Sequence, residues 1–211
     1  QERKPHFRHA LRGMSPSKPY HHGDLRAALI DAALVLLPET GVARLSLRAI
    51  ARKAGVSQTA PYSHFKNKEA LLAAVAAVGF QKLSATMAAQ AAQAESPSDQ
   101  LRAFGIGYVR FALDNPTHFR LMFGREAVSK GDDATLAEAS DHSFDMLSGG
   151  IAAHLGDGPD QTAALAAWSL VHGLSELMLN QQVARPADDE ALVAMVDAVL
   201  GNLFAGPAAQ A

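Results

Sequence analysis

The 211-residue chain contains no cysteine. Disulfide bonds and thiolate chemistry are therefore excluded, and a bound metal would need histidine and carboxylate ligands. The histidines His118, His142, His154 and His172 include no pair at the i, i+4 spacing of a helical metal site. We expect no metal and no cofactor, and the lack of cysteine is compatible with a cytoplasmic location.

Motifs of common catalytic sites and of membrane segments are also missing. The chain has no Gly-x-Ser-x-Gly elbow, no Gly-rich phosphate loop and no His-Glu-x-x-His zinc motif. No apolar run reaches the ~18 residues that a membrane-spanning helix needs. The first 23 residues are polar and basic, unlike a secretory signal. These absences predict a protein that is neither an enzyme nor a membrane protein.

Residues that favour β-strands are scarce. Aromatic residues make up 6% of the chain, whereas alanine is abundant and 48% of the residues are hydrophobic. This composition favours a packed helical core. Apolar residues recur at helical spacing in about nine segments, which predicts an all-α fold. The predicted helices begin near residues 25, 47, 58, 68, 100, 116, 135, 160 and 188. The first is expected to end at Gly41 and the eighth near residue 184, Asn67 is expected to cap the fourth, and a polar loop is expected over about 125–134.

Charge is unevenly distributed along the chain. Residues 1–68 carry a net charge of +8 and residues 69–211 one of −10, although the whole chain is at −2. A basic front end on an acidic body predicts contact with a polyanion. A basic tail without a role is the alternative, but residues 1–18 supply only part of the excess.

Four regions are predicted from these patterns. The first region, a basic arm at the start of the chain, carries Arg8, Arg12 and Lys18. These residues could add minor-groove contacts to DNA, and disorder without a role is the alternative. The predicted regions are a flexible basic arm over 1–22, a helix-turn-helix domain over 23–68, a larger helical domain over 69–205 and a disordered tail over 206–211.

Residues 47–65 give the most specific signal. Ser46 is placed to cap a short helix, and Gly55 after it can adopt the left-handed backbone of a tight turn. A second short helix extends from about residue 58 to Phe65, where Ser57 or Thr59 can cap it and Pro61 is tolerated only in its first turn. The pair predicts a helix-turn-helix. A helical hairpin with a solvated basic face is the alternative.

With its flanks, this segment resembles a known family. The run "LSLRAIARKAGVSQTAPYSHFKNKEALL" carries Ala-Gly-Val-Ser and then Tyr-x-His-Phe-x-x-Lys-Glu-x-Leu, as in the DNA-binding segment of the tetracycline-repressor (TetR) family. The preceding "YHHGDLRAALIDAALVLLPETGVARLS" is similar to the first helix and link of that family. Further along, "WSLVHGL" at 168–174 resembles the Trp-His-Gly signature of one C-terminal subgroup.

The resemblance implies a homodimeric repressor that binds double-stranded operator DNA. Tyr62 and Lys68 would contact phosphate, whereas Arg48 would reach a base or a phosphate. This chain has Thr59-Ala60-Pro61 where many members have Gly-Thr-Leu, so position 60 lacks a hydroxyl and the base-reading residue stays open. The DNA-binding candidates are Arg48, Gln58, Thr59, Tyr62, His64 and Lys68.

The C-terminal region combines aromatic and methionine side chains with few polar groups. Such residues would suit a pocket for a small, largely apolar effector, and plain core packing is the alternative. His118 and His172 are candidate polar handles. The ligand-binding candidates are Phe104, Tyr108, Phe111, His118, Met122, Phe144, Trp168 and His172.

The last two predicted helices carry many small side chains on their apolar stripes. Small residues let helices approach closely, and two helices from each subunit would build a four-helix interface. The resemblance implies a homodimer of this kind, with an ordinary intramolecular core as the alternative. The leading hypothesis is a ligand-responsive repressor. The other hypotheses are an architectural or protein-interaction module that binds DNA without sensing a ligand, and an enzyme.

Overall fold

The computed structural model describes residues 25–124, 133–156, 158 and 160–204. The predicted arm, the predicted tail and most of the loop expected at 125–134 lie outside these residues. The described part contains eight α-helices, one 3-10 helix and no strand, which confirms the all-α prediction of about nine helices. The elements are α1 (Leu25–Arg44), α2 (Leu47–Ala54), η1 (Ala60–Ser63), α3 (Lys68–Ala91), α4 (Pro97–Asp114), α5 (Pro116–Phe123), α6 (Ala134–Leu155), α7 (Gln161–Leu179) and α8 (Asp189–Phe204).

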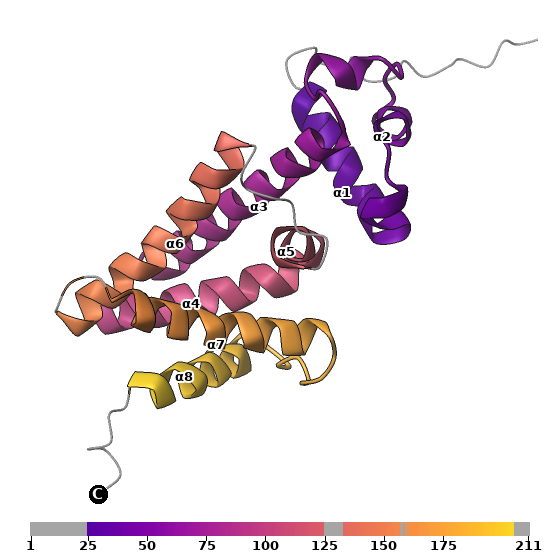
Figure 1. Ribbon diagram of the computed structural model, residues 1–211. Helices are drawn as coiled ribbons and strands as arrows, with labels where there is room; N and C mark the ends of the chain where they lie inside the picture. The colour runs from indigo at the N-terminus through magenta and orange to yellow at the C-terminus, as the bar shows by residue number, and fades with distance from the viewer. Residues whose placement is uncertain (1–24, 125–132, 157, 159, 205–211) are drawn as a thin grey trace, which may run out of the picture.

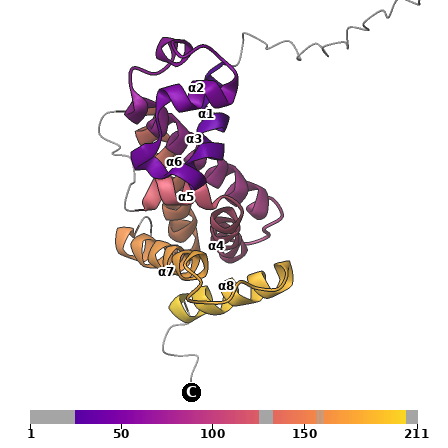
Figure 2. The ribbon, with the colours of Figure 1, turned by 90° about the vertical axis from the view of Figure 1, so that its right-hand side faces the viewer.

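The helices form two groups joined by the long helix α3. At one end α1, α2 and η1 gather around the start of α3 (Figure 1). At the other end α4 and α6 pack against α3, and α7 and α8 pack in turn against α4 (Figures 1 and 2). We call the first group the head and the second the body. The short helix α5 packs against α1 as well as α3 and α4, so it also joins the two groups.

The helix starts follow from side-chain capping. The side chain of Ser46 accepts a hydrogen bond from the backbone N–H of Ala49 at the start of α2, and that of Asn67 accepts one from Ala70 at the start of α3. Both bonds satisfy donors that the first turn leaves unpaired. Ser96 caps α4 in the same way. The caps predicted at residues 46 and 67 are thus confirmed.

Two predicted helix ends differ from the structure. Helix α1 does not stop at Gly41, because the chain turns at this residue (φ 66°) and forms one more turn to Arg44. Helix α7 ends at Leu179 and not near residue 184. There Gln181 takes a left-handed backbone (φ 58°), and the N–H of Gln182 bonds back to the carbonyl of Leu177. Both helix ends are determined by backbone turns, which the spacing of apolar residues does not predict.

The core of the body is built on the crossing of α3 and α4. A Cβ at Gly107 would lie 2.8 Å from the Cα of Met87, so this glycine lets the two backbones approach closely. Helix α8 is held on α4 by two ion pairs, Arg102 with Asp197 and Arg110 with Asp189. This packing buries Val196 and Leu200 of α8 against the body.

Two helices are long and apolar enough to cross a membrane by length and composition alone, which corrects the expectation that no such stretch exists. In α3 the apolar window is 67% buried inside the fold, so core packing accounts for its composition. In α7 the window is only 39% buried. Part of the apolar surface of α7 therefore has no partner within the described chain.

Candidate functional site

The helix-turn-helix of the head has the predicted turn. Gly55 ends α2 in the left-handed conformation (φ 73°), and its N–H and that of Val56 bond to the last carbonyls of the helix. Val56 is half-buried and packs against the core, while Phe65 is 3% exposed. The Arg26 guanidinium lies 5.6 Å from the centre of the Phe65 ring. These contacts fix the segment between residues 55 and 65 on the head.

The second element of the motif is a 3-10 helix, Ala60–Ser63, within the range predicted for a short helix. Pro61 has no N–H, so it cannot make the bond to the carbonyl of residue 57 that an α-helix would need. The backbone instead makes i, i+3 bonds, from Ala60 to Ser57, from Tyr62 to Thr59 and from His64 to Pro61. No side chain caps this element, and the hydroxyls of Ser57 and Thr59 lie 3.2 Å apart. The expectation that one of them caps it is therefore wrong.

The outer surface of the motif is polar and basic. Between residues 47 and 68 the chain has five lysines and arginines and no acidic residue. Tyr62 is 55% exposed although it is aromatic. Ser63 turns its hydroxyl back to the carbonyl of Ala60. Of the DNA-binding candidates, the exposed ones are Arg48, Gln58, Thr59, Tyr62 and His64.

Lys68 is the exception among the DNA-binding candidates. It is half-buried, and its ammonium group donates a hydrogen bond to the backbone carbonyl of Val42 at 3.1 Å. This bond ties the start of α3 to the last turn of α1. An ammonium group has three donors, so two remain for another acceptor. Lys68 thus holds the head together at the edge of the basic surface.

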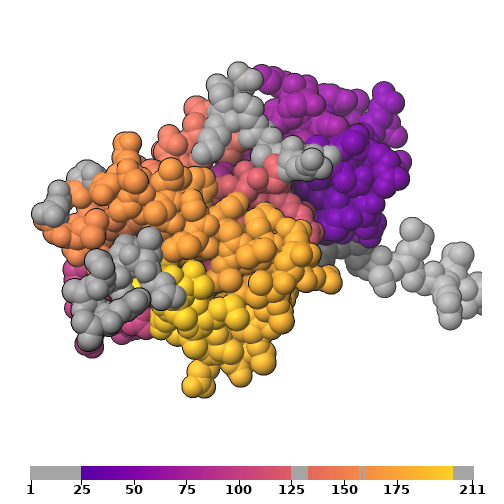
Figure 3. Space-filling view, turned by 60° about the horizontal axis from the view of Figure 1, so that its bottom comes forward, coloured from indigo at the N-terminus to yellow at the C-terminus, as the bar shows by residue number. Residues whose placement is uncertain are grey.

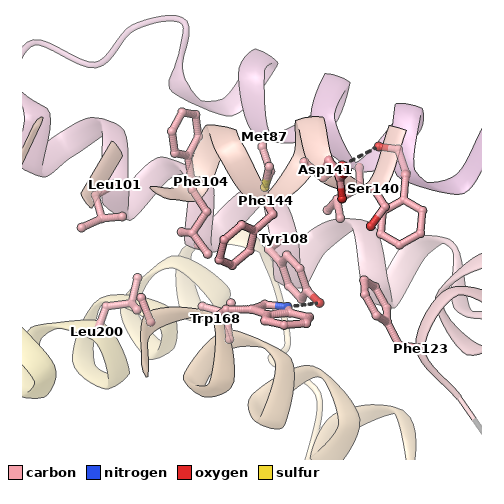
Figure 4. Close-up of a pocket in the computed structure, with 17 residues that line it drawn as sticks. Met87, Leu101, Phe104, Tyr108, Phe123, Ser140, Asp141, Phe144, Trp168 and Leu200 are labelled. Atoms are coloured by element: carbon pink, nitrogen blue, oxygen red, sulfur yellow. Dashed lines mark hydrogen bonds between the residues drawn. The ribbon is translucent and has the colours of Figure 1, made fainter. Parts of the chain in front are cut away.

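The body contains a cavity of about 260 Å³. Six helices contribute to its wall, and the labelled side chains converge on it in Figure 4. Phe144 is 36% exposed and Asp141 is exposed, so both lie where the cavity meets solvent. The lining residues are Phe80, Leu83, Met87, Leu101, Phe104, Gly105, Tyr108, Phe123, Ser140, Asp141, Ser143, Phe144, Leu147, Ala167, Trp168, Val171 and Leu200.

Two polar groups of the wall bond to each other. The indole N–H of Trp168 donates to the Tyr108 hydroxyl at 3.1 Å, as the dashed line in Figure 4 shows. The same hydroxyl lies 2.9 Å from Nδ1 of His172. Burial raises the pKa of Tyr108 far above its usual range, so the phenol keeps its proton. Burial also lowers the pKa of His172, with Glu176 partly opposing the shift. A neutral His172 can therefore accept a hydrogen bond from the Tyr108 hydroxyl at Nδ1.

Four of the eight ligand-binding candidates line the cavity, namely Phe104, Tyr108, Phe144 and Trp168. His172 lies one layer behind the wall, stacked on Phe119 with 5.2 Å between ring centres. The remaining three candidates, Phe111, His118 and Met122, are buried in the core and do not line the cavity.

His118 has an unusual environment. It is 4% exposed, and its Nε2 has no hydrogen-bond partner among the described residues. Burial and the nearby Lys82 lower the pKa of His118 to about 4, with Asp31 opposing the shift. The ring packs beside Gly79 of α3. His118 is thus a neutral core residue between α3 and α5.

Sequence reasoning missed several lining residues. Ser140 and Asp141 were not candidates, although Ser140, Ser143, Phe144 and Leu147 recur at the i, i+3, i+4 and i+7 positions of one face of α6. Two serines inside an otherwise apolar stripe are the signal that could have identified this wall. Leu200 gave no such signal, because its position depends on the packing of α8 against α4.

Two sequence profiles of one family match the two groups of helices. The profile described as "Bacterial regulatory proteins, tetR family" matches residues 29–75. The profile described as "Tetracyclin repressor-like, C-terminal domain" matches residues 101–199. The chain belongs to the TetR family. Its members are helix-turn-helix transcriptional regulators and not enzymes, in agreement with the predicted class.

Individual TetR-family proteins and solved structures resemble different parts of the chain. Over 51 residues it is 53% identical to the tetracycline repressor protein class D of Escherichia coli, a match that covers 24% of this chain and 23% of the repressor. A protein of unknown function from Rhodococcus sp. RHA1 is 34% identical, with a TM-score of 0.72 over 88% of this chain and 98% of the other. The transcriptional regulator FadR from Bacillus subtilis, solved in complex with stearoyl-CoA, shares the fold at 18% identity, with a TM-score of 0.63 over 85% and 98% of the two chains.

Proposed function

We propose that this TetR-family protein is a transcriptional repressor that binds operator DNA through its head and is released by a small, largely apolar molecule in the body cavity. The proposal rests on the exposed surface of the helix-turn-helix. There an exposed Tyr62 lies within a stretch of five basic residues and no acidic residue. A turn of this kind positions side chains for a major groove, and the flanking cations neutralise phosphates.

The roles of the head residues follow from their exposure. Tyr62 is proposed to contact a phosphate and Arg48 a base or a phosphate, while Gln58 and Thr59 are proposed to face bases. His64 would lie at the edge of the groove. Lys68, whose ammonium group holds Val42, would contact phosphate with its remaining donors while it positions the motif.

A homodimer through α7 and α8 is part of the proposal. The two helices lie side by side on one face of the body (Figure 3). On α7, Leu165 is 53% and Leu177 is 46% exposed, and a Cβ at Gly173 would meet nothing within 4 Å. A second copy would cover this apolar surface and present two heads to half-sites about 34 Å apart.

The cavity and the head are connected by two helices. Helix α3 carries Phe80, Leu83 and Met87 of the cavity wall and reaches the head at Lys68. Helix α5 carries Phe123 of the wall, and its Thr117 and Arg120 line a groove together with α1. A ligand that moves either helix would change the distance between the heads of a dimer. Ligand and DNA would then weaken each other's binding by the same factor.

The cavity favours one of the two candidate functions over the other. A DNA-binding module without ligand sensing would need no open space in its body, whereas this body holds a cavity of about 260 Å³ that opens beside Phe144. We therefore favour the ligand-responsive repressor. We also propose a cytoplasmic location and membership of the TetR subgroup with a Trp-His-Gly C-terminal signature, on the basis of Trp168, His172 and Gly173 in α7.

Fluorescence anisotropy with the DNA upstream of the protein's own gene tests the DNA half of the proposal. Wild type should bind this duplex about 1000-fold more tightly than a scrambled one. Tyr62→Phe should weaken the specific binding about threefold to tenfold, because one hydrogen bond to phosphate is lost. Ser63→Ala is the matched control, since its hydroxyl already bonds to Ala60, and its affinity should stay unchanged. Equal, salt-sensitive binding of both duplexes would contradict the proposal.

A further inference from the structure

The charge of the cavity wall indicates what kind of molecule it accepts. Among the described lining residues Asp141 is the one with a formal charge, and it lies at the opening on α6. No lysine or arginine of the described chain lines the cavity. An anionic group in the cavity would face a carboxylate without a compensating cation, and a cationic group would gain from it.

The hydrogen-bond donors of the wall point to the same sign of charge. The indole N–H of Trp168 is already bonded to Tyr108. The Tyr108 hydroxyl is bonded in turn to His172. The Ser143 hydroxyl lies within hydrogen-bond distance of the Ala139 and Phe80 carbonyls and of Ser84 Oγ. A buried anion needs several free donors, whereas these three side chains already use theirs and Ser140 adds the one further hydroxyl among the described lining residues.

The aromatic wall suits a cation as well. Six aromatic side chains line the cavity, and the face of an aromatic ring carries partial negative charge. The ring of Phe144 lies near the opening, and its centre is 6.1 Å from that of Trp168. A cation held between such faces and a carboxylate is recognised in the way that aromatic cages recognise quaternary ammonium groups.

We infer that the effector of this protein is a lipophilic cation, whose apolar part fills the aromatic cavity and whose positive group lies between Asp141 and the rings of Phe144 and Trp168. This inference rests on the proposed function, because it assigns a ligand class to the same cavity. It adds a residue, Asp141, that selects the ligand by charge.

The chain contains a built-in reporter for the test. Trp168 is the single tryptophan of the protein and lines the cavity, so its fluorescence reports an occupant directly. We would titrate the full chain with decyltrimethylammonium, decanol and decanoate, which share an alkyl tail and differ in charge. The measurement needs no DNA. It is therefore independent of whether the head binds an operator.

The matched variants are Asp141→Asn and Asp145→Asn. Both remove one negative charge from an exposed position of α6, but only Asp141 lines the cavity. We expect the cation to bind most tightly and Asp141→Asn to weaken it about threefold to fivefold, the range of a partly exposed ion pair. Decanol binding should not change. Asp145→Asn should keep the wild-type affinities.

Several outcomes would overturn the inference. Decanoate that binds as tightly as the cation would do so, as would equal effects of the two asparagine variants on cation binding. Equal binding of all three probes would remove the charge preference but leave the cavity as a ligand site, so the proposed function would stand. Unchanged Trp168 fluorescence with every probe would overturn the inference and the ligand half of the proposed function together. A failure of the head to bind DNA would contradict the proposed function and leave the charge preference intact.

Discussion

The head and the body of this protein place their candidate functional residues in opposite ways. In the head these side chains come from one run of about twenty residues, and most are exposed. In the body the cavity wall is assembled from six helices between residues 80 and 200, and most of it is buried. A binding motif made of consecutive residues can be recognised from the sequence. A cavity is visible only after packing has brought distant residues together.

In the head, substitution of a buried residue beneath the exposed motif should reduce folding stability most. Phe65→Ala should lower the free energy of unfolding by about 3–5 kcal/mol, because it removes a buried ring that anchors the recognition turn. Urea denaturation gives this value. The neighbouring exposed His64→Ala should cost less than about 0.5 kcal/mol. Equal costs for the two variants would show that the turn is not anchored by Phe65.

In the body, the crossing of α3 and α4 should be the sensitive point. Gly107→Ala should destabilise the protein by about 1–3 kcal/mol, because the new methyl group meets the backbone of Met87. Gly149→Ala is the control. It lies in the exposed face of α6 with nothing within 4 Å of the new Cβ, so it should stabilise the fold by about 0.5–1 kcal/mol. Thermal melts of the two variants should shift in opposite directions, and a shift in the same direction would contradict this account of the crossing.

The junction of head and body should give the protein an acid sensitivity. His118 has a pKa of about 4 in the folded state against 6.5 when unperturbed, so the unfolded chain binds its proton first. Burial of the neutral His118 ring therefore costs no protonation energy above pH 6.5. As the pH falls from 6.5 toward 4, the free energy of unfolding should decrease by about 1.4 kcal/mol for each pH unit. His118→Leu should flatten this part of the curve of unfolding free energy against pH. The exposed His142→Leu should not, and a curve unchanged by His118→Leu would contradict the assignment.

The smallest expected effect concerns the basic surface of the head. Arg48→Ala should reduce the slope of log affinity against log salt by about one, because one phosphate contact is lost. Arg185→Ala is a control of equal charge on an exposed position of the body, far from the motif in sequence. It should leave the slope unchanged. The same loss of slope in both variants would mean that net charge, and not the surface of the motif, determines DNA affinity.

Much of the fold was predictable because its signals are local. The caps at Ser46 and Asn67, the left-handed Gly55 and the position of Pro61 depend on residues within a turn of one another. The sequence did not predict that Pro61 turns the recognition element into a 3-10 helix, although the missing N–H is the cause. The prediction for Lys68 was also incomplete. Its hydrogen bond to the Val42 carbonyl joins residues 26 positions apart, and no local sequence pattern indicates such a contact.

The cavity was predicted only in part for the same reason. Trp168, Tyr108, Phe104 and Phe144 were candidates because large aromatic residues are distinctive in an alanine-rich chain. Phe111 is also aromatic, but it faces the core and is 1% exposed. Hydrophobic periodicity shows that a side chain points inward, and it does not show whether packing leaves space beside it. Asp141 was missed because an exposed acidic residue is ordinary on a helix surface.

The most direct test of the account is a hydroxyl-radical footprint of the protein on the DNA fragment upstream of its own gene. A dimer that presents two heads through α7 and α8 should protect two half-sites whose centres lie about one helical turn apart, and Tyr62→Phe should weaken both to the same extent. A single protected half-site, or uniform protection along the fragment, would contradict a dimeric repressor that reads its operator with paired heads.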